Sequence, residues 1–130
     1  MTLDAIGIAG SGLTLHRKWR DAVADNIANV NTVTPTDGDA FQARYIVAQA
    51  GQGTTGAYVA GTALGDAEGI LTFDPNNPLA DEAGYVRRPD IDLAEQMGAL
   101  IMAQRGYQAN AAVVDRAKTS YEAALQIGRS

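Results

Sequence analysis

The chain has 130 residues, 46% of them hydrophobic, which fits one domain with a buried core and excludes a disordered polypeptide. Its net charge of −5 arises in the middle, since residues 33–89 carry seven acids and three bases, whereas residues 1–32 carry three of each. The lack of a basic surplus argues against a nucleic-acid binder, and the lack of cysteine excludes disulfides, thiolate catalysis and cysteine-based metal sites.

The first residues do not have the features of a cleaved export signal. They carry Asp4, lack a basic start and never form a long apolar run. The sequence also has no run of about 20 apolar residues, the length that a membrane-spanning helix needs. We therefore expect that, if the protein leaves the cytoplasm, it does so without a cleaved signal peptide.

Apolar residues in the N-terminal third recur at helical spacing. The pattern predicts a helix from Leu13 to about Asn29, and Gly7, Gly10 and Gly12 predict that the first dozen residues are loose. Two neighbouring rows carry the pattern, with Ile6, Ala9, Leu13, Val23, Ile27 and Val30 in one and Ile8, Leu15, Trp19 and Ala22 in the other.

Three asparagines, Asn26, Asn29 and Asn31, stand where this apolar pattern ends. Asparagine is a mediocre residue for a helix interior, because its amide competes for backbone hydrogen bonds. It does tolerate the left-handed conformation at a helix C-terminus, which is one explanation. The second explanation is that these amides meet another chain.

Turn residues and short β-type runs alternate in the middle of the chain. The β-type runs are FQARYIV (41–47), AYV (57–59) and ILTF (70–73), and the turn clusters are residues 35–39, 51–56 and 74–78. We expect two to four short strands within residues 40–73, as a hairpin or small sheet that projects from a helical pair.

The C-terminal third has the clearest periodicity. Pro89 and the capping-box pair Asp92 and Glu95 set a helix start at about residue 92, and no later proline stops it before about residue 128. At ~1.5 Å per residue this helix spans roughly 55 Å, more than a compact globule of this length. A heptad seam runs along it through Leu93, Met97, Leu100, Gln104, Tyr107, Ala111, Val114, Lys118, Tyr121, Leu125 and Gly128.

Two glycines interrupt this seam region. Gly98 and Gly106 indicate either a bend or the close packing of a neighbouring helix, and the sequence leaves both open. Because one amphipathic helix lies at each end of the chain, the sequence favours a two-helix coiled pair.

The sequence offers no convincing chemical site. The single histidine, His16, is flanked by cations and is expected at the surface, and GSGLT at 10–14 lacks the ending of a phosphate loop. DPNNPLADE at 74–82 departs from a calcium loop and is expected to be a solvated turn. Asp90, Asp92 and Glu95 are explained by helix capping and the helix dipole. We therefore expect no catalytic, cofactor-binding or metal-binding residues.

The ends of the chain carry a family resemblance. Ser11-Gly12-Leu13 followed by NIANVNT (26–32) resembles the signature of bacterial flagellar rod and hook proteins. The lead-in at 74–89 and the run GYVRRPDIDLAEQMGALIMAQRGYQANAAVVDRAKTSYEAALQIGR (84–129) resemble the flagellar basal-body rod proteins of the proximal-rod FlgC type. The middle, roughly 40–68, matches only in general character, and Asp25, Gly106 and Gln108 depart from the pattern.

The resemblance implies a structural subunit and not an enzyme. Such proteins are exported unfolded through the flagellar type III apparatus and polymerise into the rod across the periplasm, with paired terminal helices as the inner tube and the middle facing outward. The implied partners are copies of the chain, other rod proteins, and the membrane-embedded base and export apparatus. The expected subunit-interaction residues are Leu13, Trp19, Val23, Asn26, Ile27, Asn29, Asn31, Thr32, Leu93, Met97, Leu100, Tyr107, Asn110, Val114, Tyr121 and Leu125.

The expected fold is therefore mainly α with a small β region, in which the terminal helices pair as a coiled-coil-like hairpin. We expect three segments: the N-terminal helix (1–32), an outward loop and β-rich segment (33–89) and the long C-terminal helix (90–130). The alternatives are a filament subunit of another secretion system, which is usually nearly all helical, a coiled-coil adaptor or export chaperone, and a small enzyme.

Overall fold

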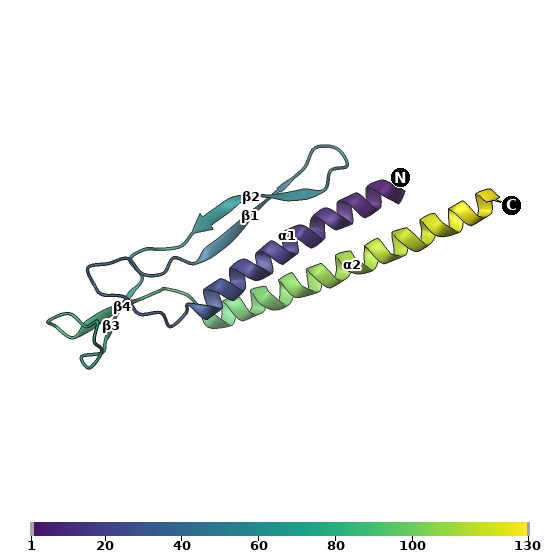
Figure 1. Ribbon diagram of the computed structural model, residues 1–130. Helices are drawn as coiled ribbons and strands as arrows, with labels where there is room; N and C mark the ends of the chain where they lie inside the picture. Colours follow the sequence, from purple (N-terminus) through teal and green to yellow (C-terminus); the bar gives the residue numbers. More distant parts are fainter. Residues whose placement is uncertain (1, 130) are drawn as a thin grey trace.

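A computed structural model describes the backbone of residues 2–129 and the side chains of residues 3–129 (Figure 1). Two long helices run side by side, and two antiparallel β-hairpins occupy the segment between them. The elements are α1 (Thr2–Ala28), β1 (Arg44–Ala50), β2 (Ala57–Leu64), β3 (Ile70–Phe73), β4 (Tyr85–Arg88) and α2 (Leu93–Arg129). The expected fold, mainly helical with a small β part between paired terminal helices, is confirmed.

Helix α1 is longer than the sequence pattern indicates. The predicted start at Leu13 is wrong, because the helix begins at Thr2 and runs through Gly7, Gly10 and Gly12 without a break. Helix α2 supports this segment, and Gly12 lies directly against the Asn110 side chain, where a larger residue would overlap it. Glycine here permits the two helices to approach, so tertiary packing outweighs its low helix propensity.

Helix α2 begins where the sequence places it and spans 37 residues. The Asp92 carboxylate oxygen Oδ1 accepts hydrogen bonds from the backbone N–H groups of Ala94 (2.9 Å) and Glu95 (3.3 Å), as an N-cap does. The helix continues through Gly98 and Gly106. Its C-terminal turns extend beyond the N-terminal end of α1, so this end of the helix protrudes from the rest of the chain (Figure 1).

The two helices meet through small side chains. On α2 the side facing α1 is formed by Gln96, Ala99, Ala103, Gly106 and Asn110, of which Gln96 and Ala103 are buried. This row lies one position away from the predicted heptad seam. Consequently the seam residues Leu100, Tyr107, Ala111 and Val114 are half-buried at its edge, and Leu93, Met97, Gln104, Lys118, Tyr121, Leu125 and Gly128 are exposed.

The first hairpin lies along α1. The paired residues run from Arg44 with Leu64 to Ala50 with Ala57. A bulge in β2 leaves Ala60 without a partner, because Val47 pairs with Gly61 and the next residue, Ala48, pairs with Val59. Helix α1 contacts both strands, so the hairpin covers one side of α1 while α2 covers the other (Figure 1). The expectation that this hairpin projects from the helical pair is therefore wrong, since α1 supplies its packing surface.

The second hairpin lies near the junction between the end of α1 and the start of α2 (Figure 1). Strands β3 and β4 pair from Ile70 with Arg88 to Phe73 with Tyr85, and an isolated bridge joins Thr34 to Arg87. The strand prediction covered residues 70–73 and missed β4. The stretch around residues 74–84 forms the expected turn, in which Asn77 Nδ2 donates to Asp74 Oδ2 over 3.1 Å.

The interior of the chain is built from small side chains. Among the described residues, the buried apolar ones are Ala9, Ala22, Val23, Ala40, Ala43, Val86 and Ala103. The large apolar side chains lie largely at the surface, on both helices and both hairpins. The division into three segments stays a prediction, although α1 ends at Ala28 and α2 starts at Leu93, close to the expected borders.

Candidate functional site

Asn26 joins three elements from a fully buried position in α1. Its Oδ1 accepts the backbone N–H of Arg44 over 2.8 Å, and its Nδ2 donates both to the Arg44 carbonyl (3.0 Å) and to Gln96 Oε1 of α2 (3.0 Å). The amide thus pairs with the first residue of β1 as a neighbouring strand would, and it reaches α2 at the same time. Asn26 therefore fixes the base of the hairpin on the helix pair.

The other two asparagines are also bonded within the chain. Asn29 Nδ2 donates to the Asp25 carbonyl over 2.9 Å, and Asn29 Oδ1 accepts from the Thr32 hydroxyl over 3.0 Å. Asn31 Oδ1 accepts a hydrogen bond from Arg88 at the end of β4. The first explanation for this cluster is wrong, because no asparagine among the described residues has the positive φ of a left-handed conformation. Asn29 and Thr32 instead close the helix end through local hydrogen bonds.

The second explanation, that these amides meet another chain, does not hold for Asn26. Its side chain is fully buried and its amide is bonded inside the chain, so it does not present a surface to another subunit in this conformation. Contacts of Asn29, Asn31 and Thr32 with another chain stay predictions. Gln96, the partner of Asn26, is absent from the predicted interaction residues, because the predicted heptad seam passes through Met97 and not through Gln96. A row of small and polar residues at helical spacing could have indicated the side of α2 that faces α1: Gln96, Ala99, Ala103, Gly106 and Asn110.

A second attachment holds the far end of the hairpin. Ser11 Oγ on α1 accepts the backbone N–H of Ala57 over 3.1 Å and donates to the Ile8 carbonyl over 2.6 Å. Gly56, with φ of 82°, lies so close to Ser11 that a Cβ there would overlap the hydroxyl. The hairpin is thus tied to α1 at both ends, by Asn26 at its base and by Ser11 near its turn.

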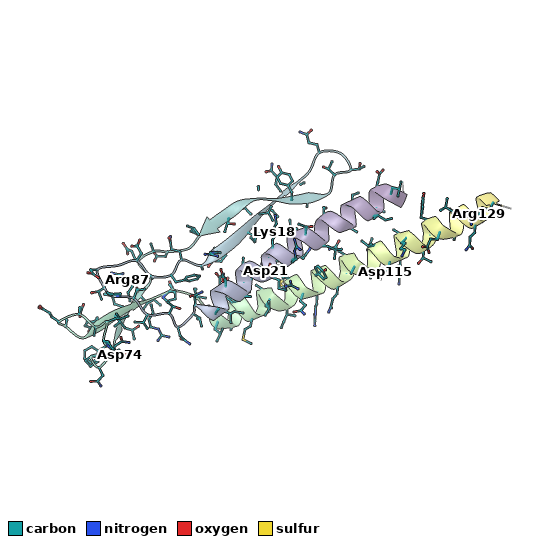
Figure 2. The ribbon with its side chains drawn as sticks, in the orientation of Figure 1. Lys18, Asp21, Asp74, Arg87, Asp115 and Arg129 are labelled. Atoms are coloured by element: carbon teal, nitrogen blue, oxygen red, sulfur yellow. The ribbon has the colours of Figure 1, made fainter. Side chains whose placement is uncertain are left out.

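Charged residues of α1 line a groove of about 360 Å³ under the hairpin. Lys18 and Asp21 lie on this side of α1 (Figure 2), and Ile46 and Val59 approach from the hairpin. Asp25 forms an ion pair with Arg44 at the base. The Arg44 and Asp25 side chains are 51% and 45% exposed, so this ion pair contributes little to stability compared with the buried Asn26 amide.

The His16 ring of α1 lies directly against Gly106 of α2. A Cβ at Gly106 would overlap the His16 ring, and His16 Nδ1 lies 2.7 Å from the Gly12 carbonyl oxygen. The expectation that His16 is a surface residue is therefore wrong, since its ring is half-buried against α2. Of the two readings for Gly106, close helix packing is confirmed, whereas Gly98 has open space beside it.

The predicted interaction residues fall into three groups by exposure. Val23 and Asn26 are buried within the chain. Six are exposed: Asn31, Thr32, Leu93, Met97, Tyr121 and Leu125. The remaining residues are half-buried along the helix pair: Leu13, Trp19, Ile27, Asn29, Leu100, Tyr107, Asn110 and Val114. Among these, Tyr107 lies under the Arg20 guanidinium, whose carbon is 5.9 Å from the ring centroid.

Within residues 3–129 no group of three or more histidine, cysteine, aspartate or glutamate side chains is placed to hold a metal ion. Asp92 caps α2, as its position at a helix start indicates. Neither helix, over its described length, is both long and apolar enough to cross a membrane.

The geometry is that of a scaffold whose polar side chains fix one element on another. Residues 82–127, which contain β4 and nearly all of α2, match the family described as flagellar basal body rod FlgEFG protein C-terminal. The chain is 37% identical to the flagellar basal-body rod protein FlgC of Salmonella typhimurium and 39% identical to that of Yersinia enterocolitica, over 98% of both chains in each case. The chain belongs to the FlgC family.

FlgC similarity extends along the whole length of the chain and is not limited to the helices. The FlgC protein of Bacillus subtilis is 26% identical over 96% of this chain and 97% of its own. The resemblance to FlgC-type rod proteins is therefore confirmed, and the region between the helices is included in it.

Proposed function

We propose that the chain assembles into the proximal part of the flagellar rod through its terminal helices and transmits torque along it. Membership of the FlgC family makes it a structural subunit of the flagellar basal-body rod. The distribution of apolar side chains is the main support for this assembly. Alanine and valine fill the interior, whereas many leucine, isoleucine, methionine and aromatic side chains are exposed.

Exposed apolar side chains on this scale are typical of a surface that another protein covers. On α2 they run from Leu93 and Met97 near its start to Tyr121 and Leu125 near its end. Residues 118–129 of α2 are exposed, because α2 extends past α1 (Figure 1). Covering these turns with helices of neighbouring subunits would remove the exposed apolar area from water.

The proposed subunit contacts follow from this exposure. Leu93, Met97, Tyr121 and Leu125 of α2 supply apolar contacts, and Asn31 and Thr32 supply polar contacts beyond the end of α1. The half-buried residues of the expected set border these surfaces. Val23 and Asn26 act indirectly, because they hold the helices and the hairpin in the arrangement that the neighbours meet.

Amides at these contacts would fix the register between subunits. Apolar packing alone tolerates sliding, whereas a buried amide without a partner costs about 1–3 kcal/mol. Asn31 is placed to play this role, because its Oδ1 accepts from Arg88 and its side chain remains exposed. An Asn31→Leu variant is expected to impair rod assembly without impairing export.

The partners are copies of the chain, other rod proteins, and the membrane-embedded base and export apparatus of the flagellum. The site of action is the rod in the periplasmic space, reached without a cleaved signal peptide. The protein acts as a structural element and not as an enzyme.

The test is complementation of a strain that lacks its own rod subunit of this family. The unaltered chain is expected to restore swimming and to be present in purified basal bodies. A Leu125→Asp variant, which places a charge on the uncovered end of α2, should be exported but should be depleted from basal bodies. Glu122→Gln, a change at an exposed charged residue nearby, serves as the control. Normal assembly of Leu125→Asp would refute the proposed role of this helix end.

A further inference from the structure

The base of the β1–β2 hairpin is fixed by buried groups. Asn26 is fully buried, and its amide both donates to and accepts from the backbone of Arg44. The preceding residue, Ala43, is 3% exposed, and its carbonyl accepts the N–H of Gly65 over 2.7 Å. Hydrogen bonds among buried groups open rarely, because opening leaves the groups unpaired or requires water to enter. The base is therefore the firmly held part of the hairpin.

The outer half of the hairpin, residues 48–59, is held much less firmly. None of these residues is buried, and Tyr58 is 49% exposed. The tie between this half and α1 is the N–H of Ala57, which donates to Ser11 Oγ over 3.1 Å. A two-stranded hairpin without a packed face is marginally stable in water. The outer half thus depends on α1 for support but has few contacts with it.

Space also remains between the outer half and α1. A groove of about 340 Å³ lies between Ser11, Thr14 and Lys18 on α1 and Tyr58 and Val59 on the strand. It adjoins the groove of about 360 Å³ described above, since Lys18 and Val59 line both. Side chains that face a gap lack the dispersion contacts of a close-packed interior. Moving the outer half away from α1 therefore breaks few packed contacts.

The strand ladder has a weak point between the two halves. Val47 pairs with Gly61 and Ala48 pairs with Val59, so the bulge at Ala60 lies at the border of the outer half. A bulge interrupts the cross-strand hydrogen bonds, and glycine weakens a strand interior. The hairpin consequently bends most easily at the place where its firmly held base meets its weakly held outer half.

We propose that residues 48–59 form a strap that lifts off α1 in the free chain, bending at the bulge while the base stays bonded to Asn26. The closed strap covers the side of α1 that carries Ser11 and Lys18, and the lifted strap uncovers it. The inference does not rest on the proposed function, because it concerns the chain before assembly. For a rod subunit it means that the surface around α1 has two forms in equilibrium.

Spin labels can measure the two forms, because the chain has no cysteine of its own. Gln49→Cys in the strap and Leu64→Cys at the base are each combined with Gln104→Cys in α2, and all three residues are exposed. Because α2 lies on the other side of α1, lifting lengthens the distance between positions 49 and 104 (Figure 1). Double electron–electron resonance on the free chain should give two distances for this pair and one narrow distance for positions 64 and 104, the matched control.

Two outcomes would overturn the strap. One narrow distance for both pairs would mean that the hairpin is rigid along its whole length. Two distances for both pairs would mean that the base moves together with the outer half. Neither outcome concerns incorporation into basal bodies, so failure of this inference is distinguishable from failure of the proposed function.

Removal of the tie at Ser11 tests what holds the strap closed. Ser11→Ala deletes the acceptor of the Ala57 N–H and should raise the population of the longer distance at least about threefold, the loss of one modest hydrogen bond. Thr14→Ala is the control, because Thr14 lines the same groove but its hydroxyl donates to the Gly10 carbonyl within α1. An unchanged population in Ser11→Ala would overturn the closed form as described.

Amide hydrogen exchange compares the two ends in the unaltered chain. The N–H groups of Ala57 and Arg44 both donate to side chains of α1, so each reports the attachment of its own end. We expect the Ala57 amide to be protected from exchange at least about tenfold less than the Arg44 amide. Equal protection of the two amides would overturn the strap, since the hairpin would then leave α1 only as a whole.

Discussion

Asn26 is the residue on which the arrangement of the chain depends most directly. A buried primary amide has two donors and an acceptor to satisfy, and Asn26 satisfies them with the backbone of Arg44 and the side chain of Gln96. Leucine would fill a similar volume but would leave the Arg44 backbone and Gln96 without their partner. The same substitution at Asn29 removes mainly local hydrogen bonds near a half-buried helix end.

We expect Asn26→Leu to lower the free energy of unfolding by about 2–4 kcal/mol, because buried polar groups are left unpaired. Asn29→Leu is the control and should lower it by no more than about 1 kcal/mol. Urea denaturation followed by circular dichroism measures both values. Equal effects of the two substitutions would show that Asn26 does not hold the elements together as described.

Gly106 provides a second prediction at the residue scale. In a free helix, glycine to alanine is favourable by about 1 kcal/mol, but here the new Cβ would overlap the His16 ring. Gly106→Ala should therefore be destabilising by about 1–2 kcal/mol, whereas Gly128→Ala, with open space around it, should be stabilising. Adding His16→Ala to Gly106→Ala should relieve the overlap, and thermal denaturation of the single and double variants checks this.

At the scale of elements, the sequence indicated α2 better than α1. Asp92 and the apolar period define the start and length of α2, because capping and periodicity are local properties. The first dozen residues of α1 are helical because Gly12 packs against Asn110, a contact between residues far apart in the chain. The same limit applies to Asn26 and Gln96, whose pairing depends on how the helices and hairpin meet.

The same difference between local and long-range causes separates the strands that the sequence predicts from the strand that it does not. The strand propensity of residues 41–47 and 70–73 was sufficient to predict β1 and β3. Strand β4 (Tyr85–Arg88) was missed because it is short, contains two arginines and gains its place from pairing with β3 and with Thr34. Burial of Val86 is a consequence of that pairing, and no local pattern in the sequence marks it.

The turn before β4 has a pH-dependent feature. Asp81 accepts hydrogen bonds from the backbone N–H groups of Tyr85 and Ala83 and from the Thr36 hydroxyl, and the Tyr85 bond contributes most to lowering the pKa of Asp81 below 3.8. Because the pKa is lower in the folded chain, the ionised group stabilises the fold above the unfolded pKa. This contribution disappears as the pH falls through the folded pKa.

We therefore expect the difference in melting temperature between the unaltered chain and Asp81→Ala to be constant above about pH 5 and to shrink toward zero as the pH falls below about 4. Calorimetry across this range measures it. Asp37→Ala is the control, since Asp37 is exposed and makes no hydrogen bond within the described residues. A difference that persists unchanged at pH 2 would mean that the charge of Asp81 is not what stabilises the turn.

At the scale of the whole molecule, the chain is elongated and only partly covers its own apolar surface. The hairpin and α2 lie on opposite sides of α1, so α1 is the most protected of the three (Figure 1). In α2, the residues from Lys118 onward are exposed, and Arg129 lies at the far end of this extension (Figure 2).

This arrangement predicts the order of proteolysis in the unassembled protein. Trypsin should cleave first after Arg116 and Lys118, where α2 loses its cover, and later after Arg17 and Arg20, which lie in the part of α1 covered by α2 and the hairpin. Mass mapping of a time course gives the order directly. Initial cleavage in α1 would mean that the helix pair does not hold in the isolated chain.

The unequal lengths of the two helices also have a consequence for the kinetics of the proposed assembly. Helix α1 has 27 residues and α2 has 37, so each incoming subunit brings a stretch of α2 that its own α1 leaves uncovered. A pair of free subunits can cover only part of this stretch, whereas the end of an existing polymer offers several neighbours at once. Addition to an existing end is then more favourable than formation of a new nucleus. If the chain assembles as proposed, we therefore expect free subunits at low concentration to remain dispersed until a template is present.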